Sequence, residues 1–370
     1  MKRTPLFEGH GAAGGRLVDF AGWEMPMQYT GVVDEYQTVR NAAGLFDVSH
    51  MGRIVVVGEG ALSFLQRVTT NNVAKLGVLE SQYSMICNET GGIKDDIFVY
   101  RMRPQEYLLC VNASNREKIA RWLSMQASGV TGVILQDRSA ELAQLALQGP
   151  ASRTILSSMG IAGIEAMKLR ACLETHLLGV TAFITRTGYT GELGYELYVP
   201  SDHALAIWNE LLTVGKSVGL KPAGLGARDL LRLEMAYLLY GNDIGEETTP
   251  IEAASEWVVD LKKGDFIGRK ILQQQKDNGA AKRLVAFELT QKAVPRHGFK
   301  ILSGDSSGGK EIGEVTSGNL SPLLQKGIGL GYVPPQTAAI GSSICIDIRG
   351  RALPAVITKP PFYRKRATHG

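Results

Sequence analysis

The chain has 370 residues, 44% of them hydrophobic and 21% charged, and its formal net charge at pH 7 is +4. This length suggests two or three domains of ordinary soluble composition, and the small net charge argues against a nucleic-acid-binding protein. No apolar run approaches the ~18 residues of a membrane-spanning helix, and the N-terminus has neither a signal-peptide nor a transit-peptide pattern. The four cysteines are widely scattered and contain no Cys-x-x-Cys pair, which predicts a reducing compartment, and Cys87, Cys110 and Cys345 lie in apolar strand-like runs where a buried thiol is expected. We therefore expect a cytoplasmic protein.

The first predicted element is a helix over Gly31 to Ala43, and an order of strand, helix, strands and helix then occurs twice. In the first copy the strands are expected at Arg53–Val57, Tyr83–Cys87, Asp96–Tyr100 and Tyr107–Asn112, and the helices at Ala61–Val68 and Asn115–Gln126. In the second copy the strands are expected at Leu142–Gln148, His176–Thr187 (broken near Gly179) and Tyr195–Val199, and the helices at Ser152–Met159 and His203–Val218. Ser114 or Asn115 could cap the helix that ends the first copy. The order favours an α+β architecture in which helices pack on one face of antiparallel sheets.

The last part of the chain has a different pattern of predicted elements, with short strands in place of the mixed strands and helices. Asp229–Tyr240 is predicted as a helix with Gly241 as its C-cap, and Lys276–Lys282 is the best candidate linker. Short strands separated by Gly, Pro and Ser are then expected at Leu284–Leu289, Lys310–Ser317, Lys326–Val333, Ser342–Ile348 and Ala352–Thr358. This pattern is typical of an all-β barrel or sandwich.

An acidic pair marks the start of one predicted strand. The turn composition of residues 88–92 predicts a β-hairpin between this strand and the preceding one. Because neighbouring side chains of a strand point to opposite faces, Asp96 shares a face with Phe98, and Asp95 shares the other with Ile97. A half-buried carboxylate is costly unless it is paired or used. A solvated turn that carries two acids is the alternative interpretation.

A second motif, Arg186 to Glu196, alternates glycines with aromatic and charged residues. The chain can approach a ligand closely at the glycines, while Tyr189 offers a flat surface and Glu196 a pair of acceptors. A carboxylate that accepts two hydrogen bonds suits a guanidine-like edge, such as that of a 2-amino-4-oxo pterin. The alternative is a glycine-rich turn that joins two strands.

Two further segments have simple alternatives. Arg228 lies at the start of a predicted helix and makes an anion site plausible, although a solvated arginine with Asp229 as N-cap fits equally well. The Phe46–Gly52 segment contains Asp47, Ser49 and His50, but it lacks the Gly-x-Ser-x-Gly elbow of a hydrolase. It favours a hydrogen-bonded structural corner. No group of His, Cys and carboxylate residues has metal-ligand spacing.

Taken together, these motifs resemble the aminomethyltransferase family, the T-protein of the glycine cleavage system. The resemblance runs through the whole chain in order. The stretches that carry it are Thr4-Pro5-Leu6, Asp19–Pro26, Phe46–Gly52, Gly91–Ile97, Gln148-Gly149-Pro150, Arg186–Glu192, Pro222–Asp229, Tyr237–Gly241, Glu314–Asn319 and Lys359–Tyr363.

The resemblance implies a three-domain cloverleaf. Residues 1–275 would form a folate-binding region of two interleaved α+β lobes with antiparallel sheets, and residues 283–366 a C-terminal β-barrel. It also implies that the methylene of S-aminomethyldihydrolipoyl H-protein is transferred to tetrahydrofolate. The products would be 5,10-methylenetetrahydrofolate, ammonia and dihydrolipoyl H-protein. The implied partners are tetrahydrofolate as cosubstrate and the lipoylated H-protein. The composition, hydropathy and residue spacing themselves predict no metal, nucleic-acid or membrane partner.

The resemblance also implies roles for single residues. Asp96 would face the folate nitrogens, orient them and handle protons, with a pKa that burial is expected to raise. Tyr83 and Asn112 would line the folate cavity, Tyr189 would pack on the folate, Glu196 would hold the pterin edge, Arg228 and Tyr237 would shape the pocket, and Arg364 would lie near the folate tail or the lipoyl entrance. The family often places a tyrosine just before an arginine in the stretch Ala166–Arg170, where this chain has no aromatic residue.

Three related functions are alternatives. The folate-binding protein of iron–sulfur cluster maintenance carries a Lys-Gly-Cys-Tyr-x-Gly-Gln-Glu signature, which this sequence lacks. The folate domain of dimethylglycine- or sarcosine-oxidising enzymes needs a flavin domain in the same chain, and no dinucleotide fingerprint is found. A non-enzymatic folate carrier would bind folate without turnover.

Overall fold

The computed structural model describes residues 1–304 and 309–364, and the chain divides into two compact units. The first unit contains residues 1–86, 94–229 and 262–267, and the second contains 87–93, 230–261 and the chain from 268 onward. The predicted domain limits, 1–275 and 283–366, stay a prediction, and the last two residues of the second range lie outside the described residues.

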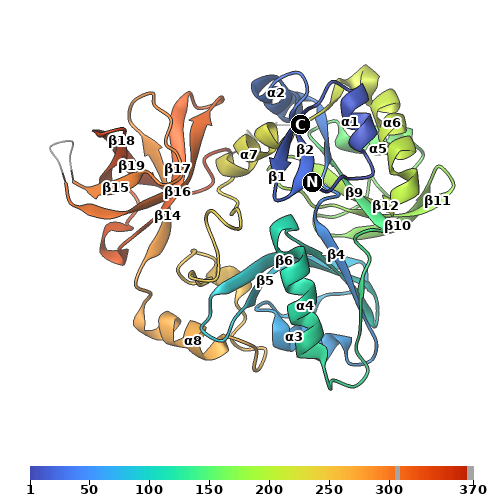
Figure 1. Cartoon of the computed structure of the whole chain (residues 1–370), viewed down its shortest axis with the longest axis horizontal. Coiled ribbons are helices and arrows are strands. Elements are labelled where there is room, and N and C mark those ends of the chain that lie inside the picture. Colours follow the sequence, from blue (N-terminus) through green and yellow to red (C-terminus); the bar gives the residue numbers. More distant parts are fainter. Residues whose placement is uncertain (305–308, 365–370) are drawn as a thin grey trace. The chain divides into compact units, whose positions relative to one another are not determined.

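The first unit contains a five-stranded sheet, antiparallel in its described pairings, with two helices on one face (Figure 1). Its strand order is β5 (Glu80–Cys87), β6 (Ile93–Arg103), β7 (Glu106–Val111), β4 (Gly52–Val57) and β8 (Ile134–Asp137). The helices are α3 (Ala61–Val68) and α4 (Arg116–Ala127). Phe64 of α3 and Trp122 of α4 share one core with Ile97 and Val99 of β6, so the Asp95 face of β6 is the helix-covered face.

A six-stranded sheet is the second layer of this unit. Its order is β10 (Cys172–Leu177), β11 (Val180–Thr185), β12 (Gly194–Pro200), β9 (Leu142–Gln148), β3 (Ala43–Asp47) and β13 (Leu220–Pro222). Only the β3–β13 pair is parallel among its described pairings. The helices α5 (Ser152–Ser158) and α6 (Ala204–Gly215) contribute to its core, in which Trp208 is fully buried.

The order that the sequence analysis finds twice corresponds to a repeated topology. The first copy runs β4, α3, β5, β6, β7, α4 along the chain, and the second runs β9, α5, β10, β11, β12, α6. Across each sheet, the second, third and fourth strands of the copy lie side by side in chain order, and the first strand of the copy lies next to the fourth. The next place is filled by β8 in one sheet and by β3, which comes before both copies, in the other. The N-terminal segment also forms α1 (Phe7–Ala12), the hairpin β1 (Arg16–Phe20) and β2 (Trp23–Gln28), and α2 (Val32–Asn41).

The second unit contains a closed six-stranded barrel, which confirms the barrel and not the sandwich (Figure 1). The barrel order is β14 (Arg283–Leu289), β17 (Lys326–Val333), β16 (Glu311–Ser321), β15 (Lys300–Ser303), β18 (Ser343–Ile348) and β19 (Arg351–Thr358). Its core includes the fully buried Phe287. The short strand β15, which the sequence analysis missed, pairs with β16 and β18 and completes the barrel.

The predicted helix over Asp229–Tyr240 is wrong in its position. The helix α7 covers Leu225–Glu234, and the chain then turns at Ala236, whose φ of 55° lies in the left-handed region. Arg232 stabilises this turn, because its guanidinium donates to the Tyr237 carbonyl and forms a buried ion pair with Asp243. The predicted linker is also partly wrong, since α8 (Arg269–Asn278) extends into it.

Short 3-10 segments occur at Val73–Lys75, Ala113–Asn115, Ser201–His203, Lys216–Val218, Glu256–Val258 and Pro335–Thr337. Cys87, Cys110 and Cys345 are buried free thiols, as predicted, and Cys172 is a buried free thiol as well. Within the described part of the chain, no helix combines the length and the apolar character that a bilayer crossing requires.

Candidate functional site

The acidic pair lies on β6 with its two carboxyl groups on opposite faces, as the strand alternation predicts. Asp95 is fully buried on the face that α3 and α4 cover, and Asp96 is half-buried on the other face. The side of β6 that carries Asp96 packs against the six-stranded sheet. Phe98 and Tyr100 lie on this side and pack with Tyr198 and other side chains of that sheet. The hydroxyl groups of Tyr100 and Tyr198 are 3.1 Å apart.

Asp96 is held by two of the residues that the sequence analysis selects. The Tyr83 hydroxyl donates to Asp96 Oδ2 at 2.9 Å, and Asn112 Nδ2 donates to Asp96 Oδ1 at 2.8 Å. Burial, and then the neighbouring Asp96, raise the pKa of Tyr83 well above its ordinary value, so the hydroxyl stays protonated and remains a donor. Three predicted residues therefore meet in one hydrogen-bonded group.

Asp95 stabilises this group from the helix-covered face of β6, through hydrogen bonds from Asn112. Its Oδ2 accepts from the Asn112 backbone N–H at 3.0 Å, and its Oδ1 accepts from the side-chain amides of Asn112 at 2.9 Å and Asn115 at 2.5 Å. Burial and the nearby Asp96 raise the pKa of Asp95, and they outweigh these three donors. Asn115 makes no side-chain cap, which corrects that expectation; Ser114 likewise makes no such cap among the described contacts. The contact of Asn115 with Asp95 has no local signal in the sequence, because the two residues come from separate elements.

A second group contains the predicted residues Glu196, Arg228 and Tyr189, which come from β12, α7 and the segment before β12. The Glu196 side chain is buried, and its two oxygens accept hydrogen bonds from Gln144 Nε2 at 3.2 Å and from the Thr187 hydroxyl. Arg228, in the first turn of α7, places its guanidinium carbon 4.8 Å from the centre of the Tyr189 ring. Such a distance is within the range of a cation–π contact.

Electrostatic interactions link side chains within the Glu196 group, and they also link this group to the Asp96 group. Burial lowers the pKa of Arg228, and the negative charge of Glu196 opposes that shift. The two charged side chains therefore interact electrostatically. Tyr189 contributes to the raised pKa of Tyr83. Arg228 Nη1 is buried, and among the described residues it has no hydrogen-bond acceptor. A buried donor without an acceptor is costly, so this atom is suited to bind an acceptor on a ligand.

The Phe46–Gly52 segment is a structural corner, as predicted. Asp47 Oδ2 lies 3.0 Å from His10 Nε2, and the Ser49 hydroxyl donates to the backbone carbonyl of Gln144 at 3.2 Å. Burial lowers the pKa of His50 to about 4, and the charges of nearby arginines add to this shift. His50 is therefore neutral at physiological pH, and the segment offers no Ser–His nucleophile.

Two predicted residues belong to the second unit. Tyr237 lies just after α7 and is 37% exposed, with its backbone N–H donating to the Arg232 carbonyl at 2.9 Å. Arg364 is exposed at the end of the described chain. Their part in a folate pocket stays a prediction.

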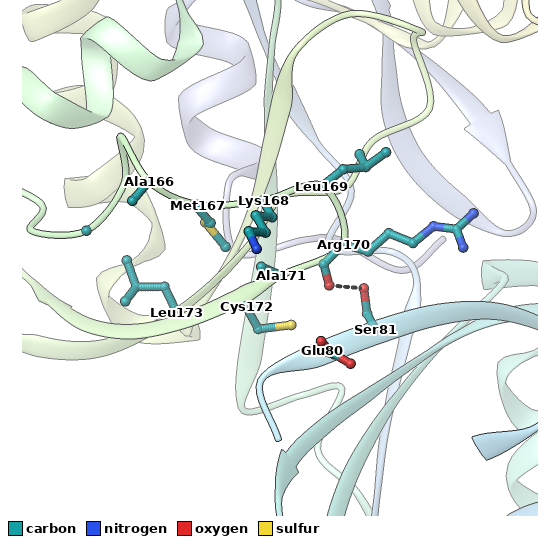
Figure 2. Close-up of a pocket in the computed structure, with 11 residues that line it drawn as sticks. Glu80, Ser81, Ala166, Met167, Lys168, Leu169, Arg170, Ala171, Cys172 and Leu173 are labelled. Atoms are coloured by element: carbon teal, nitrogen blue, oxygen red, sulfur yellow. Dashed lines mark hydrogen bonds between the residues drawn. The ribbon is translucent and has the colours of Figure 1, made fainter. Parts of the chain in front are cut away.

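A cavity of about 510 Å³ opens in the first unit where the start of β5 meets the segment that leads into β10 (Figure 2). The Ser81 hydroxyl donates to the Arg170 carbonyl at 2.9 Å on one side of it. The cavity is lined by Glu80, Ser81, Gly163 and residues 166–173. This is the segment in which Met167 and Lys168 stand where the sequence analysis notes the lack of an aromatic residue. Within the described residues, no three His, Cys or carboxylate side chains are grouped as metal ligands would be.

Comparison with known proteins identifies the family. The model of the GCVT N-terminal domain matches residues 6–263, and that of the glycine cleavage T-protein C-terminal barrel domain matches residues 282–364. The chain belongs to the glycine cleavage T-protein family. The predicted family and its transferase class are thereby confirmed.

Relatives over the full length agree with this assignment. The chain is 47% identical to the aminomethyltransferase of Halothermothrix orenii, over 98% of this chain and 100% of that protein. It is 46% identical to the aminomethyltransferase of Bacteroides thetaiotaomicron, over 98% and 99% of the two chains. The crystal structure of glycine cleavage system aminomethyltransferase T from Bartonella henselae matches with a TM-score of 0.91 at 35% identity, and 98% of each chain is covered. The predicted α+β fold with a C-terminal barrel is confirmed.

Proposed function

We propose that this protein transfers the methylene group of an S-aminomethyldihydrolipoyl H-protein to tetrahydrofolate. The main support is the pair of side-chain groups in the first unit: a carboxylate held by a tyrosine and an asparagine, and a second carboxylate beside an arginine and a tyrosine. The first group suits proton handling, and the second suits the recognition of a heteroaromatic ring with a polar edge.

The residues around Glu196 fit the folate ring. A 2-amino-4-oxo pterin has adjacent N–H and NH2 donors, which a carboxylate can accept, and a carbonyl oxygen, which needs a donor. Glu196 has acceptor capacity beyond its two hydrogen bonds, because a carboxylate has about four lone-pair sites. Arg228 Nη1 is the buried donor without a described acceptor. We propose that Glu196 and Arg228 hold the pterin and that Tyr189 packs against it.

The reaction needs two nucleophiles and a group that handles protons. Tetrahydrofolate supplies the nitrogens N5 and N10. One C–S and one C–N bond of the carrier break and two N–C bonds form, while the two N–H protons leave with the thiol and the ammonia. We propose that Asp96 orients these nitrogens and takes a proton during the transfer. Tyr83 and Asn112 fix the direction of its carboxylate lone pairs.

The partner and the compartment belong to the same proposal. The lipoylated H-protein would deliver the aminomethyl group on sulfur, and the reaction would take place in the cytoplasm. Tyr237 is proposed to complete the folate pocket, and Arg364 to lie near the folate tail or the lipoyl entrance.

The decisive experiment is turnover with aminomethylated lipoyl H-protein and tetrahydrofolate, in which ammonia and methylenetetrahydrofolate are followed together. We expect both products in equal amounts and only when folate is present. Folate binding without transfer from a competent carrier would refute the proposal. That result would instead favour the iron–sulfur maintenance protein or the folate carrier.

A further inference from the structure

Gln144, a fully buried residue of β9, connects three parts of the first unit. Its side-chain nitrogen donates to Glu196 Oε1, and its backbone carbonyl accepts from the Val48 N–H at 3.0 Å. Its backbone N–H donates to the Ser49 hydroxyl at 3.0 Å. The main chain of Gln144 is therefore fixed by the structural corner at residues 46–52, independently of its side chain.

A cysteine on the opposite sheet lies beside the side-chain oxygen of Gln144. Cys110 Sγ on β7 lies 3.5 Å from Gln144 Oε1. Burial raises the pKa of Cys110 to about 12, so its sulfur carries a proton and is a weak donor. The thiol at Oε1 and the Glu196 carboxylate at Nε2 favour the same orientation of the amide, in which the NH2 group points toward Glu196.

We infer that Gln144 is a positioning residue that aims the Glu196 carboxylate at the pterin edge, an inference that rests on the proposed folate site. A glutamate side chain rotates freely about its last bond when nothing holds it. Here Gln144 holds one oxygen and the Thr187 hydroxyl holds the other, so the plane of the carboxylate is fixed before a ligand arrives. Prior orientation of an acceptor pair strengthens binding because less conformational freedom is lost on association.

The inference is tested with Gln144→Leu, which keeps the approximate volume and removes the donor. The dissociation constant for tetrahydrofolate is measured by titration, and kcat with a saturating carrier and folate is measured separately. We expect the dissociation constant to rise ~10-fold, the effect of one lost hydrogen bond to a charged group, while kcat falls by less than ~3-fold because Asp96 is unaffected. The matched control is Gln136→Leu, an exposed glutamine on β8, which should bind folate like the wild type.

A double-variant cycle separates positioning from general damage to the fold. In a Glu196→Ala background, Gln144→Leu should add less than ~2-fold to the dissociation constant, since the carboxylate that it positions is gone. An undiminished penalty in that background, or wild-type binding by Gln144→Leu alone, would overturn the inference. If Gln144→Leu does not fold, Thr187→Val removes the other donor to Glu196 and must show the same dependence on Glu196. A wild-type protein that binds no folate would instead refute the proposed function.

Discussion

Asp96→Asn is the most informative single substitution, because the structure allows it to change chemistry with little change in shape. The carboxylate accepts from Tyr83 and Asn112. An asparagine can turn its amide oxygen toward the Asn112 NH2 and its own NH2 toward the Tyr83 hydroxyl, which can accept as well as donate. Both hydrogen bonds are therefore kept, and only the ability to take a proton and the negative charge are lost.

The expected loss follows from that chemistry. Removal of a proton-handling group slows turnover by ~10²–10⁴-fold, which corresponds to about 3–5 kcal/mol in the activation free energy. The dissociation constant for tetrahydrofolate should stay within about threefold of the wild type, because Glu196 and Arg228 are unchanged. The assay measures ammonia and methylenetetrahydrofolate from the aminomethylated carrier. The control is Asp202→Asn, an exposed carboxylate beside His203, and full activity of Asp96→Asn would refute the reasoning.

Other predictions concern stability and are checked by chemical denaturation. The folded-state pKa of His50, about 4, lies below the value near 6.5 of an unfolded chain, so the unfolded state binds more protons between these values. Stability should therefore fall by up to about 3 kcal/mol as the pH drops through this window, and His50→Leu should remove that component of the difference curve. The guanidinium of Arg53 is buried and donates to four backbone carbonyls. Arg53→Met should cost about 3 kcal/mol or more, and a loss below about 1 kcal/mol would contradict its structural role. Arg232→Met should cost about 3–5 kcal/mol because it leaves Asp243 buried without its cation, and replacement of Asp243 by leucine in the same chain should recover part of that loss.

Local patterns in the sequence were enough to predict most elements and the two faces of β6. The alternation along that strand separates Asp95 from Asp96 without knowledge of any partner. The helix after Arg228 was misplaced because its apolar pattern continues past Glu234, while an ion pair between Arg232 and Asp243 imposes a turn. Tertiary contacts of this kind override local helix propensity.

The candidate site was only partly predictable for the same reason. Asp96, Tyr189, Glu196 and Arg228 stand out as charged or aromatic residues within motifs, and family resemblance adds Tyr83 and Asn112. Residues that act through a neighbour carry no such local signal. Gln144 and Asn115 are ordinary polar residues in the sequence, and their contacts come from strands and helices far away along the chain.

The position of β3 in the six-stranded sheet, whose other strands all come after the first copy, has a consequence for biosynthesis. Strand β3 emerges from the ribosome early, but its partners β9 and β13 follow only after the whole first copy has been made. Until the chain has been synthesised as far as residue 222, β3 lacks at least one of its two neighbouring strands, and its backbone groups on that side are unpaired. Long-range pairing of this kind slows folding, and an uncovered strand edge invites association with other chains. A fragment that stops before Leu142 should therefore aggregate when it is expressed alone, whereas a chain cut after Pro222 retains every strand of both sheets.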